Sequence, residues 1–214
     1  GVLRVSLLAS GTFIPAVPPL VTFSLIGVML SAMLCSRQAD IKSLIAFSSV
    51  SHMGLVIAAA MLKTEWSIVG SMMMMISHGL VSSALFCLAN ASYERSHSRT
   101  LLVLQGSQII IPLIAAWWLV VTLMNLALPP SLNFMGEMSM LTSLFQWSNF
   151  TLLMTGCAVI FTTLYSLYMF WSAQRGRFSP LAKSSSPLQT REHLLFLLHV
   201  FPALLLIFYP DLMH

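Results

Sequence analysis

The sequence predicts an all-α membrane protein, a polytopic bundle of transmembrane helices. Of its 214 residues, 57% are hydrophobic and only 7% are charged, and the mean hydropathy is +0.88. Soluble domains carry about 25% charged residues, so this chain lacks the charge to cover a globular surface in water. Its long runs are apolar on every side, which argues against alternating membrane strands. The composition excludes a cytosolic enzyme, a secreted disulfide scaffold and a disordered regulator.

The charged residues fall into short clusters separated by long uncharged runs. A spanning helix needs about 20 mainly apolar residues. We therefore predict seven complete spans, near residues 15–35, 43–62, 67–90, 107–128, 131–147, 149–173 and 193–209. Residues 1–9 are interpreted as the tail of an earlier span, because the chain does not begin with Met and its first apolar run is short. We expect a fragment or a processed chain whose beginning is missing.

Prolines and tryptophans support these boundaries. Three prolines lie at the start of the first span, where missing amide donors cost least, and Pro129-Pro130 interrupts a long apolar tract. Three tryptophans lie near predicted span ends, as interfacial aromatic residues do; these are Trp66, Trp147 and Trp171. The predicted organisation is a remnant span with a loop (1–14), a transmembrane bundle (15–173), a polar connector (174–192) and a final helix with the C-terminus (193–214).

The membrane orientation depends on a single segment. Lys and Arg concentrate on one side of a membrane, but seven spans would leave four of them on one side and six on the other. If residues 131–147 did not cross, the count would become eight against two.

Glu137 is the most informative polar residue, because it is the only charged residue from 100 to 174. A charge at the bilayer centre costs at least about 2.5 kcal/mol, so such a group is expected to line a cavity or to have a partner. Two prolines, an asparagine and a glycine precede it, which is typical of a helix broken inside the membrane. A carboxyl group there can hold a proton and release it when a cation approaches. The alternative is a surface turn with Glu137 at the membrane interface.

Lys42 is the second candidate. Asp40 and Lys42 could simply belong to a loop between two spans. Against this, polar side chains continue into the following apolar run, where Ser48, Ser51 and His52 share one helical face. A lysine leading onto such a face suits a hydrated proton path, since buried lysines exchange protons readily. We expect Lys42 Nζ to face the protein interior within reach of Ser48 and His52.

His78 lies in the middle of a predicted span, beside Ser77 and near two further serines. Its position is compatible with a helix–helix hydrogen bond and with proton transfer. The neighbouring run of four methionines is expected to pack against other helices. The three cysteines are far apart, so we expect buried thiols. No nucleotide, haem or metal motif is present, and we expect no cofactor or metal site in this chain.

Several stretches carry a family resemblance. Residues 37–54, with the sequence RQADIKSLIAFSSVSHMG, resemble the signature of the antiporter-like membrane subunits of respiratory complex I, NADH:ubiquinone oxidoreductase. Residues 77–80 and 93–99 narrow the resemblance to one branch of that family, and residues 126–137 and 165–170 agree with it. The methionine excess resembles that of animal mitochondrial translation products, which implies a multi-pass protein of the mitochondrial inner membrane.

The resemblance implies a fold of two inverted five-helix repeats, of which residues 15–173 would form the second while the first is missing. It also implies proton translocation along a central axis of lysines, histidines and a glutamate. On this sequence the relay residues are Lys42, His78 and Glu137, and the supporting residues are Asp40, Ser48 and His52. NADH, FMN, iron–sulfur clusters and ubiquinone would be bound by other subunits. The implied partners are neighbouring antiporter-like chains, other membrane-arm subunits, lipids and protons, without nucleic acid.

Two alternatives remain open at this point. Multisubunit cation/proton antiporters share the positions that resemble Lys42 and Glu137. A seven-span receptor or passive scaffold is compatible with the count of spans, although a receptor needs no glutamate after a Pro-Pro break.

Overall fold

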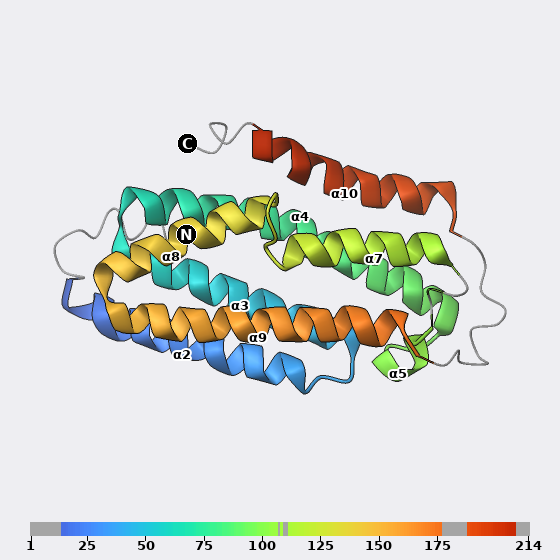
Figure 1. Ribbon diagram of the computed structural model, residues 1–214, viewed down its shortest axis with the longest axis horizontal. Coiled ribbons are helices and arrows are strands. Elements are labelled where there is room, and N and C mark those ends of the chain that lie inside the picture. The colour runs from blue at the N-terminus through green and yellow to red at the C-terminus, as the bar shows by residue number, and fades with distance from the viewer. Residues whose placement is uncertain (1–13, 107, 109–110, 177–187, 209–214) are drawn as a thin grey trace.

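The chain folds into a bundle of long, roughly antiparallel helices (Figure 1). The computed structural model describes residues 14–106, 108, 111–176 and 188–208. Within these ranges every regular element is a helix, and the one extended pairing is an isolated bridge between Asp40 and Thr100. The predicted all-α class is therefore confirmed. The proposed helix at residues 1–9 lies outside the described residues.

Five helices are long and apolar enough to cross a membrane. They are α2 (Val17–Ser36), α3 (Ile41–Leu62), α4 (Glu65–Ser96), α9 (Asn149–Gln174) and α10 (Thr190–Phe208). A short 3₁₀ turn, η1 (Ile14–Ala16), precedes α2, and a single turn, α5 (Leu101–Leu104), follows α4. Each of the five matches a predicted span, because a long uncharged run has few ways other than a helix to satisfy its backbone in lipid.

The remaining two long helices, α7 (Pro112–Asn125) and α8 (Leu132–Trp147), correct the prediction of seven complete spans. They contain 14 and 16 residues, whereas the hydrocarbon core requires about 20. Figure 1 shows α7 and α8 following one another along the bundle, with the break near its middle. Together they make one interrupted crossing. Hydropathy alone did not show this, because each half is uncharged or nearly so over its whole length.

Because α7 and α8 make one crossing, the Lys and Arg residues at each end of the bundle can be compared. The C-terminal ends of α2, α4 and α9 lie at one end of the bundle, together with the N-terminal ends of α3 and α10 (Figure 1). Among the described residues, six Lys and Arg side chains belong to the loops and helix termini at that end, against one, Lys63, at the other end. We call it the positive end. Such an asymmetry is the normal signature of a fixed membrane orientation.

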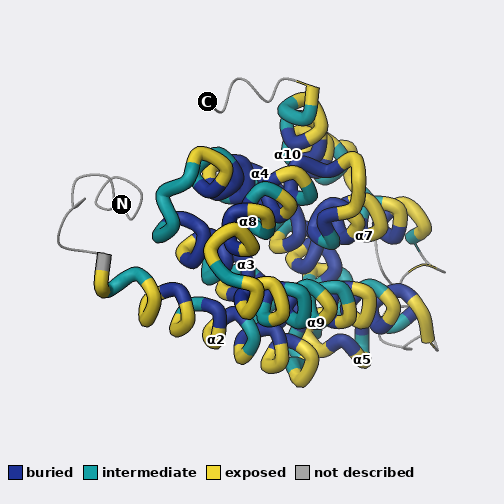
Figure 2. The backbone as a smooth tube through the Cα atoms, turned by 60° about the vertical axis from the view of Figure 1, so that its left-hand side comes forward, coloured by how far each residue is buried: buried dark blue, intermediate teal, exposed yellow. Residues whose placement is uncertain are grey.

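Burial follows the expectation for a membrane bundle. Figure 2 shows buried residues concentrated on α3, α4 and α8 in the centre, and exposed residues along the outer sides of α2, α9 and α10. The exposed residues are largely apolar and include Phe23, Leu153 and Leu198, as lipid-facing surfaces require. Cys35 is buried as predicted, whereas Cys87 and Cys157 are only partly buried.

Glycines allow α4 and α8 to approach closely. A Cβ atom on Gly136 would lie 3.1 Å from the backbone nitrogen of Met74, and one on Gly70 would collide with Ser139 Oγ. Small residues at such contacts let helix backbones meet in membranes. The residue after Gly136 is Glu137, so this contact fixes the carboxylate-bearing turn of α8 against α4.

Candidate functional site: a buried His–His–Glu cluster beside a helix break

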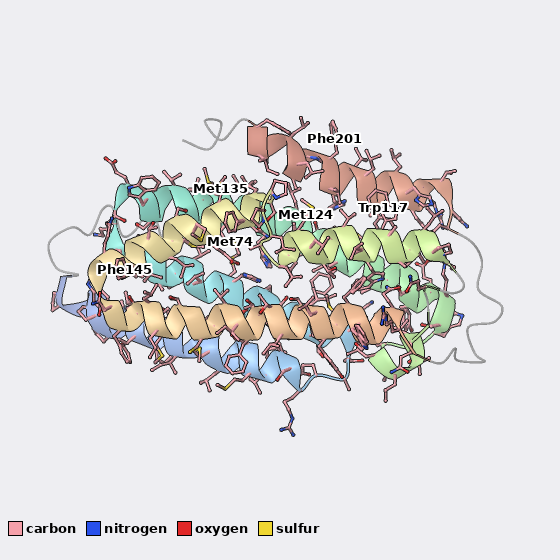
Figure 3. All side chains as sticks on the ribbon, viewed as in Figure 1. Met74, Trp117, Met124, Met135, Phe145 and Phe201 are labelled. Carbon is pink, nitrogen blue, oxygen red and sulfur yellow. The ribbon has the colours of Figure 1, made fainter. Side chains whose placement is uncertain are left out.

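The break between α7 and α8 is built from local backbone chemistry. Residues 126–131 leave the helical path, with Ala127 at a positive φ of 50° and a cis peptide between Pro129 and Pro130. The Ser131 side chain accepts a hydrogen bond from Phe134 N at 3.3 Å and caps the new helix. Asn133 Nδ2 donates to Met124 O at 3.0 Å and ties the two halves together. Figure 3 shows Met124 beside this break.

Glu137 lies in the second turn of α8, directly after this break. It is 9% exposed, so its carboxylate is inside the bundle and not at its rim. The predicted combination of an interrupted helix and a buried glutamate is therefore present, and the alternative of an interfacial glutamate is wrong.

A histidine from α3 contacts Glu137, and a second histidine, from α4, lies beside the first. His52 Nδ1, from α3, lies 3.4 Å from Glu137 Oε1. The ring of His78, from α4, lies with its centroid 5.0 Å from that of His52. Both histidines are 3% exposed. The bundle thus brings three ionisable side chains together from three helices, which we call the buried cluster.

The hydrogen bonding of the buried cluster is incomplete. His52 Nε2 and both ring nitrogens of His78 are buried and have no hydrogen-bond partner among the described residues. Buried polar atoms in folded proteins are normally paired, and exceptions mark functional positions or sites for ordered water. These unpaired nitrogens all belong to the two histidines of the buried cluster.

A further polar side chain reaches the same region from α9. Tyr165 is fully buried, and its hydroxyl lies 3.4 Å from Ser51 Oγ. Ser51 donates to Ser48 O at 2.9 Å, and Ser48 donates to Ile45 O at 2.7 Å. Sequence analysis did not select Tyr165 as a site residue. Its hydroxyl is one of several in an uncharged span, so no sequence signal set it apart.

Lys42 lies elsewhere. It occupies the first turn of α3 at the positive end, and its Nζ donates to Asn90 Oδ1 at 3.4 Å and lies 5.2 Å from the centre of the Tyr93 ring. His52 follows ten residues later, about 15 Å along the helix at 1.5 Å per residue. Nζ therefore contacts α4 at this end and does not reach His52. Residues on the same face of a helix can still be far apart along its axis, as Lys42 and His52 are.

The other predicted residues are placed as follows. Asp40 immediately precedes α3 and makes no capping hydrogen bond through its side chain. Met73 and Met74 are buried and pack against other helices. Across the residues that the structure describes, no group of three His, Cys, Asp or Glu side chains is arranged to hold a metal ion.

Fold and cluster together define a class: an integral, polytopic helical membrane protein with a buried ionisable centre at a broken helix. Residues 1–163 match the family described as NADH:quinone oxidoreductase/Mrp antiporter, transmembrane region. The chain belongs to this family. Family membership replaces the receptor alternative.

Relatives narrow the similarity to the branch that the sequence motifs indicated. NADH-ubiquinone oxidoreductase chain 4 of Scyliorhinus canicula is 55% identical over 194 residues, which are 91% of this chain and 42% of that protein. The chain 4 protein of Gadus morhua is 49% identical over 213 residues, 100% of this chain and 46% of that protein. The chain thus spans less than half the length of these curated relatives.

Solved structures agree on the fold. A chain of respiratory complex I from Thermus thermophilus with bound NADH superposes with a TM-score of 0.88 over 96% of this chain and 44% of its own length, at 24% identity. A chain of the Mrp complex from Dietzia sp. superposes with a TM-score of 0.75 over 87% of this chain and 21% of its own, at 22% identity.

Proposed function

We propose that this chain forms part of a proton-translocating membrane subunit of NADH:ubiquinone oxidoreductase in the mitochondrial inner membrane. The observation that carries the proposal is the buried cluster, with His52 Nδ1 at 3.4 Å from Glu137 Oε1 and His78 next to His52. Three ionisable groups inside a membrane bundle are costly, and such residues mark ion pathways and proton relays.

The chemistry of the cluster is proton exchange without covalent intermediates. A protonated Glu137 donates its proton to His52 Nδ1, and the imidazolium then releases a proton from Nε2 towards His78. Imidazole suits this step because one ring nitrogen can accept a proton while the other releases one. The helix break just before Glu137 supplies backbone dipoles near the carboxylate, as broken helices do in transporters.

Lys42 serves this path, in our proposal, as a charged group at its positive end and not as its middle member. Asp40 immediately precedes α3, and Ser48, which donates to Ile45 O, lies on α3 between Lys42 and His52. Moving one charge across the membrane requires about 2.3 kcal/mol per 100 mV, and a series of sites divides that work. NADH, FMN, iron–sulfur clusters and ubiquinone are assigned to other subunits, so this chain performs no redox step. Its partners are the neighbouring membrane-arm chains.

The test uses the complete complex with Glu137→Gln, which keeps the side-chain volume and removes the exchangeable proton. We expect an assembled complex whose proton translocation through this subunit is lost. The matched control is Glu65→Gln, since Glu65 is exposed at the start of α4. Protons moved per electron are counted in sealed vesicles. Full stoichiometry with Gln at 137 would exclude the proposed relay.

A second candidate function is a subunit of a multisubunit cation/proton antiporter. The family description names Mrp antiporters, and the Mrp complex chain shares the fold. The two functions separate in one assay: translocation that depends on Na⁺ and not on NADH oxidation favours the antiporter.

A further inference from the structure

A groove opens at the positive end between α4 and α10, away from the buried cluster. It encloses about 680 Å³, a size common among small-molecule sites. Its lining combines charged and apolar side chains: Lys42, Asn90, Glu94 and Arg191 among the polar ones, and Phe86 and Leu195 among the apolar ones.

Three charged side chains of the groove have no ion-pair partner among the described residues. Glu192 pairs with Arg95, whose Nη2 lies 2.6 Å from Glu192 Oε2. That leaves Lys42, Arg191 and Glu94. Arg191 makes no hydrogen bond to another described side chain, and Glu94 accepts only one, from Asn90 Nδ2 at 3.0 Å. Two cations and one carboxylate therefore face a ligand that should carry both signs of charge.

The apolar part of the groove lies deeper in the membrane. Phe86 precedes Glu94 by eight residues on α4, about 12 Å along the helix axis. Leu195 follows Arg191 by about one turn on α10, and both Phe86 and Leu195 are 39% exposed. Trp117 of α7 (Figure 3) donates to His193 Nδ1 at 3.0 Å and so joins α7 to the α10 helix that bears Leu195. The groove is thus charged at headgroup level and apolar towards the bilayer centre.

We propose that this groove binds one phosphatidylethanolamine molecule. Arg191 and Lys42 hold the phosphate, the ethanolamine ammonium donates hydrogen bonds to the Glu94 carboxylate, and an acyl chain lies along Phe86 and Leu195. Hydrogen bonding to Glu94 selects this lipid. An anionic lipid would neutralise the two cations but would offer Glu94 no cationic N–H donor beside Asn90, and the quaternary ammonium of phosphatidylcholine has no N–H to donate.

The groove at the opposite end serves as an internal comparison. It encloses about 410 Å³ and is lined by Glu65, Trp66 and apolar side chains. Its described lining contains no Lys or Arg, so it offers nothing to hold a phosphate. Both grooves combine charged and apolar side chains, but only the groove at the positive end has both cations and carboxylates in its described lining.

Cys87 provides a local probe, since it lines the groove and is partly exposed. The purified complete complex is stripped of phospholipid in detergent and treated with N-ethylmaleimide, and labelling of Cys87 is followed by peptide mass spectrometry. We expect dioleoyl phosphatidylethanolamine to slow labelling of Cys87 but not of Cys157, which lies on α9 outside the groove. The concentration of dioleoyl phosphatidylcholine that gives the same protection should be about tenfold higher, because this lipid lacks one charge-assisted hydrogen bond to the groove.

Variants identify the contacts. Arg191→Gln and Glu94→Gln should each raise the half-protecting concentration of phosphatidylethanolamine about tenfold. Arg175→Gln is the matched control, because Arg175 is an exposed arginine that stacks on Trp171 outside the groove. Equal protection by phosphatidylcholine or phosphatidylglycerol would overturn the assignment. So would a Cys87 that reacts equally with and without lipid, or one that never reacts because a neighbouring chain covers it. None of these results depends on proton translocation.

Discussion

Two polar regions of this molecule share the helix α3 and differ in almost every other respect. At the positive end, Lys42 is partly exposed and hydrogen-bonded to Asn90, and close by Arg95 pairs with Glu192. Ten residues further along, His52 is buried, and its Nε2 has no partner among the described residues. Polar groups at the rim have partners in Asn90, Arg95 and Glu192, whereas three ring nitrogens of the buried cluster have none among the described residues. Incomplete pairing, more than polarity, distinguishes the candidate relay.

The largest effect should come from His52→Gln, which retains a hydrogen-bonding side chain and removes the titrating ring. Proton translocation by the complete complex should fall on the order of 100-fold, the usual contribution of a positioned acid–base group. The control is His199→Gln, because the one hydrogen-bond contact of His199 within the described part of the chain is to Leu195 O of its own helix, at 2.8 Å. Translocation is measured as acidification of sealed vesicles. Equal behaviour of the two variants would remove the distinction between the buried cluster and the rest of the bundle.

Gly136→Ala should have the next largest effect. Its new Cβ would meet backbone and Cβ atoms of Met74 at 3.1 and 3.2 Å, and backbone atoms cannot move aside. We expect a loss of about 1–3 kcal/mol from overpacking, together with slower translocation because the turn carrying Glu137 is displaced. Gly156→Ala adds the same methyl group to α9 where nothing lies within 4 Å. Thermal stability of the subunit in the purified complex should separate the two.

The ion pair of Arg95 and Glu192 should matter for stability and not for transport. Its side chains are 8% and 15% exposed, so removal of either partner leaves a charge in a poorly hydrated place. We expect Arg95→Met or Glu192→Gln to destabilise the α4–α10 contact by about 3 kcal/mol, and the double variant to cost less than the sum. Strict additivity in melting experiments would show that the pair contributes nothing.

Lys42→Ala should have the smallest effect on translocation. A partly exposed charge at the bundle end modulates a nearby path by about two- to fivefold, the range for weakly coupled charges. The measurement is the same vesicle assay, with His52→Gln as reference. If Lys42→Ala abolishes translocation as completely as His52→Gln does, the contrast between the two ends of α3 is wrong and Lys42 belongs to the central relay.

Much of the fold was predictable, because long uncharged runs in the sequence indicate membrane helices. The interrupted crossing was predictable only in part. Pro129 and Pro130 indicated the break, but no hydropathy pattern says whether the chain turns back or continues in the same direction after it. That choice changed seven crossings into six and decided the orientation count.

The candidate site was predictable residue by residue and not as an arrangement. Glu137, His78 and His52 were each selected for their chemistry within apolar runs. Their contact joins α3, α4 and α8, and His52 is 85 residues from Glu137 in the sequence, so no local spacing encodes it. Lys42 was placed too near His52 for the opposite reason, since closeness in sequence suggested closeness in space.

The most direct test of the central claim is infrared difference spectroscopy of the complete complex during NADH oxidation, with attention to the carbonyl band of protonated carboxyl groups. If the buried cluster carries protons, a signal from a carboxyl group that gains and loses its proton should appear during turnover and disappear in Glu137→Gln, while Glu65→Gln retains it. A carboxyl signal that is unchanged by Glu137→Gln, in a complex that turns over normally, would show that Glu137 does not exchange a proton and would contradict the account.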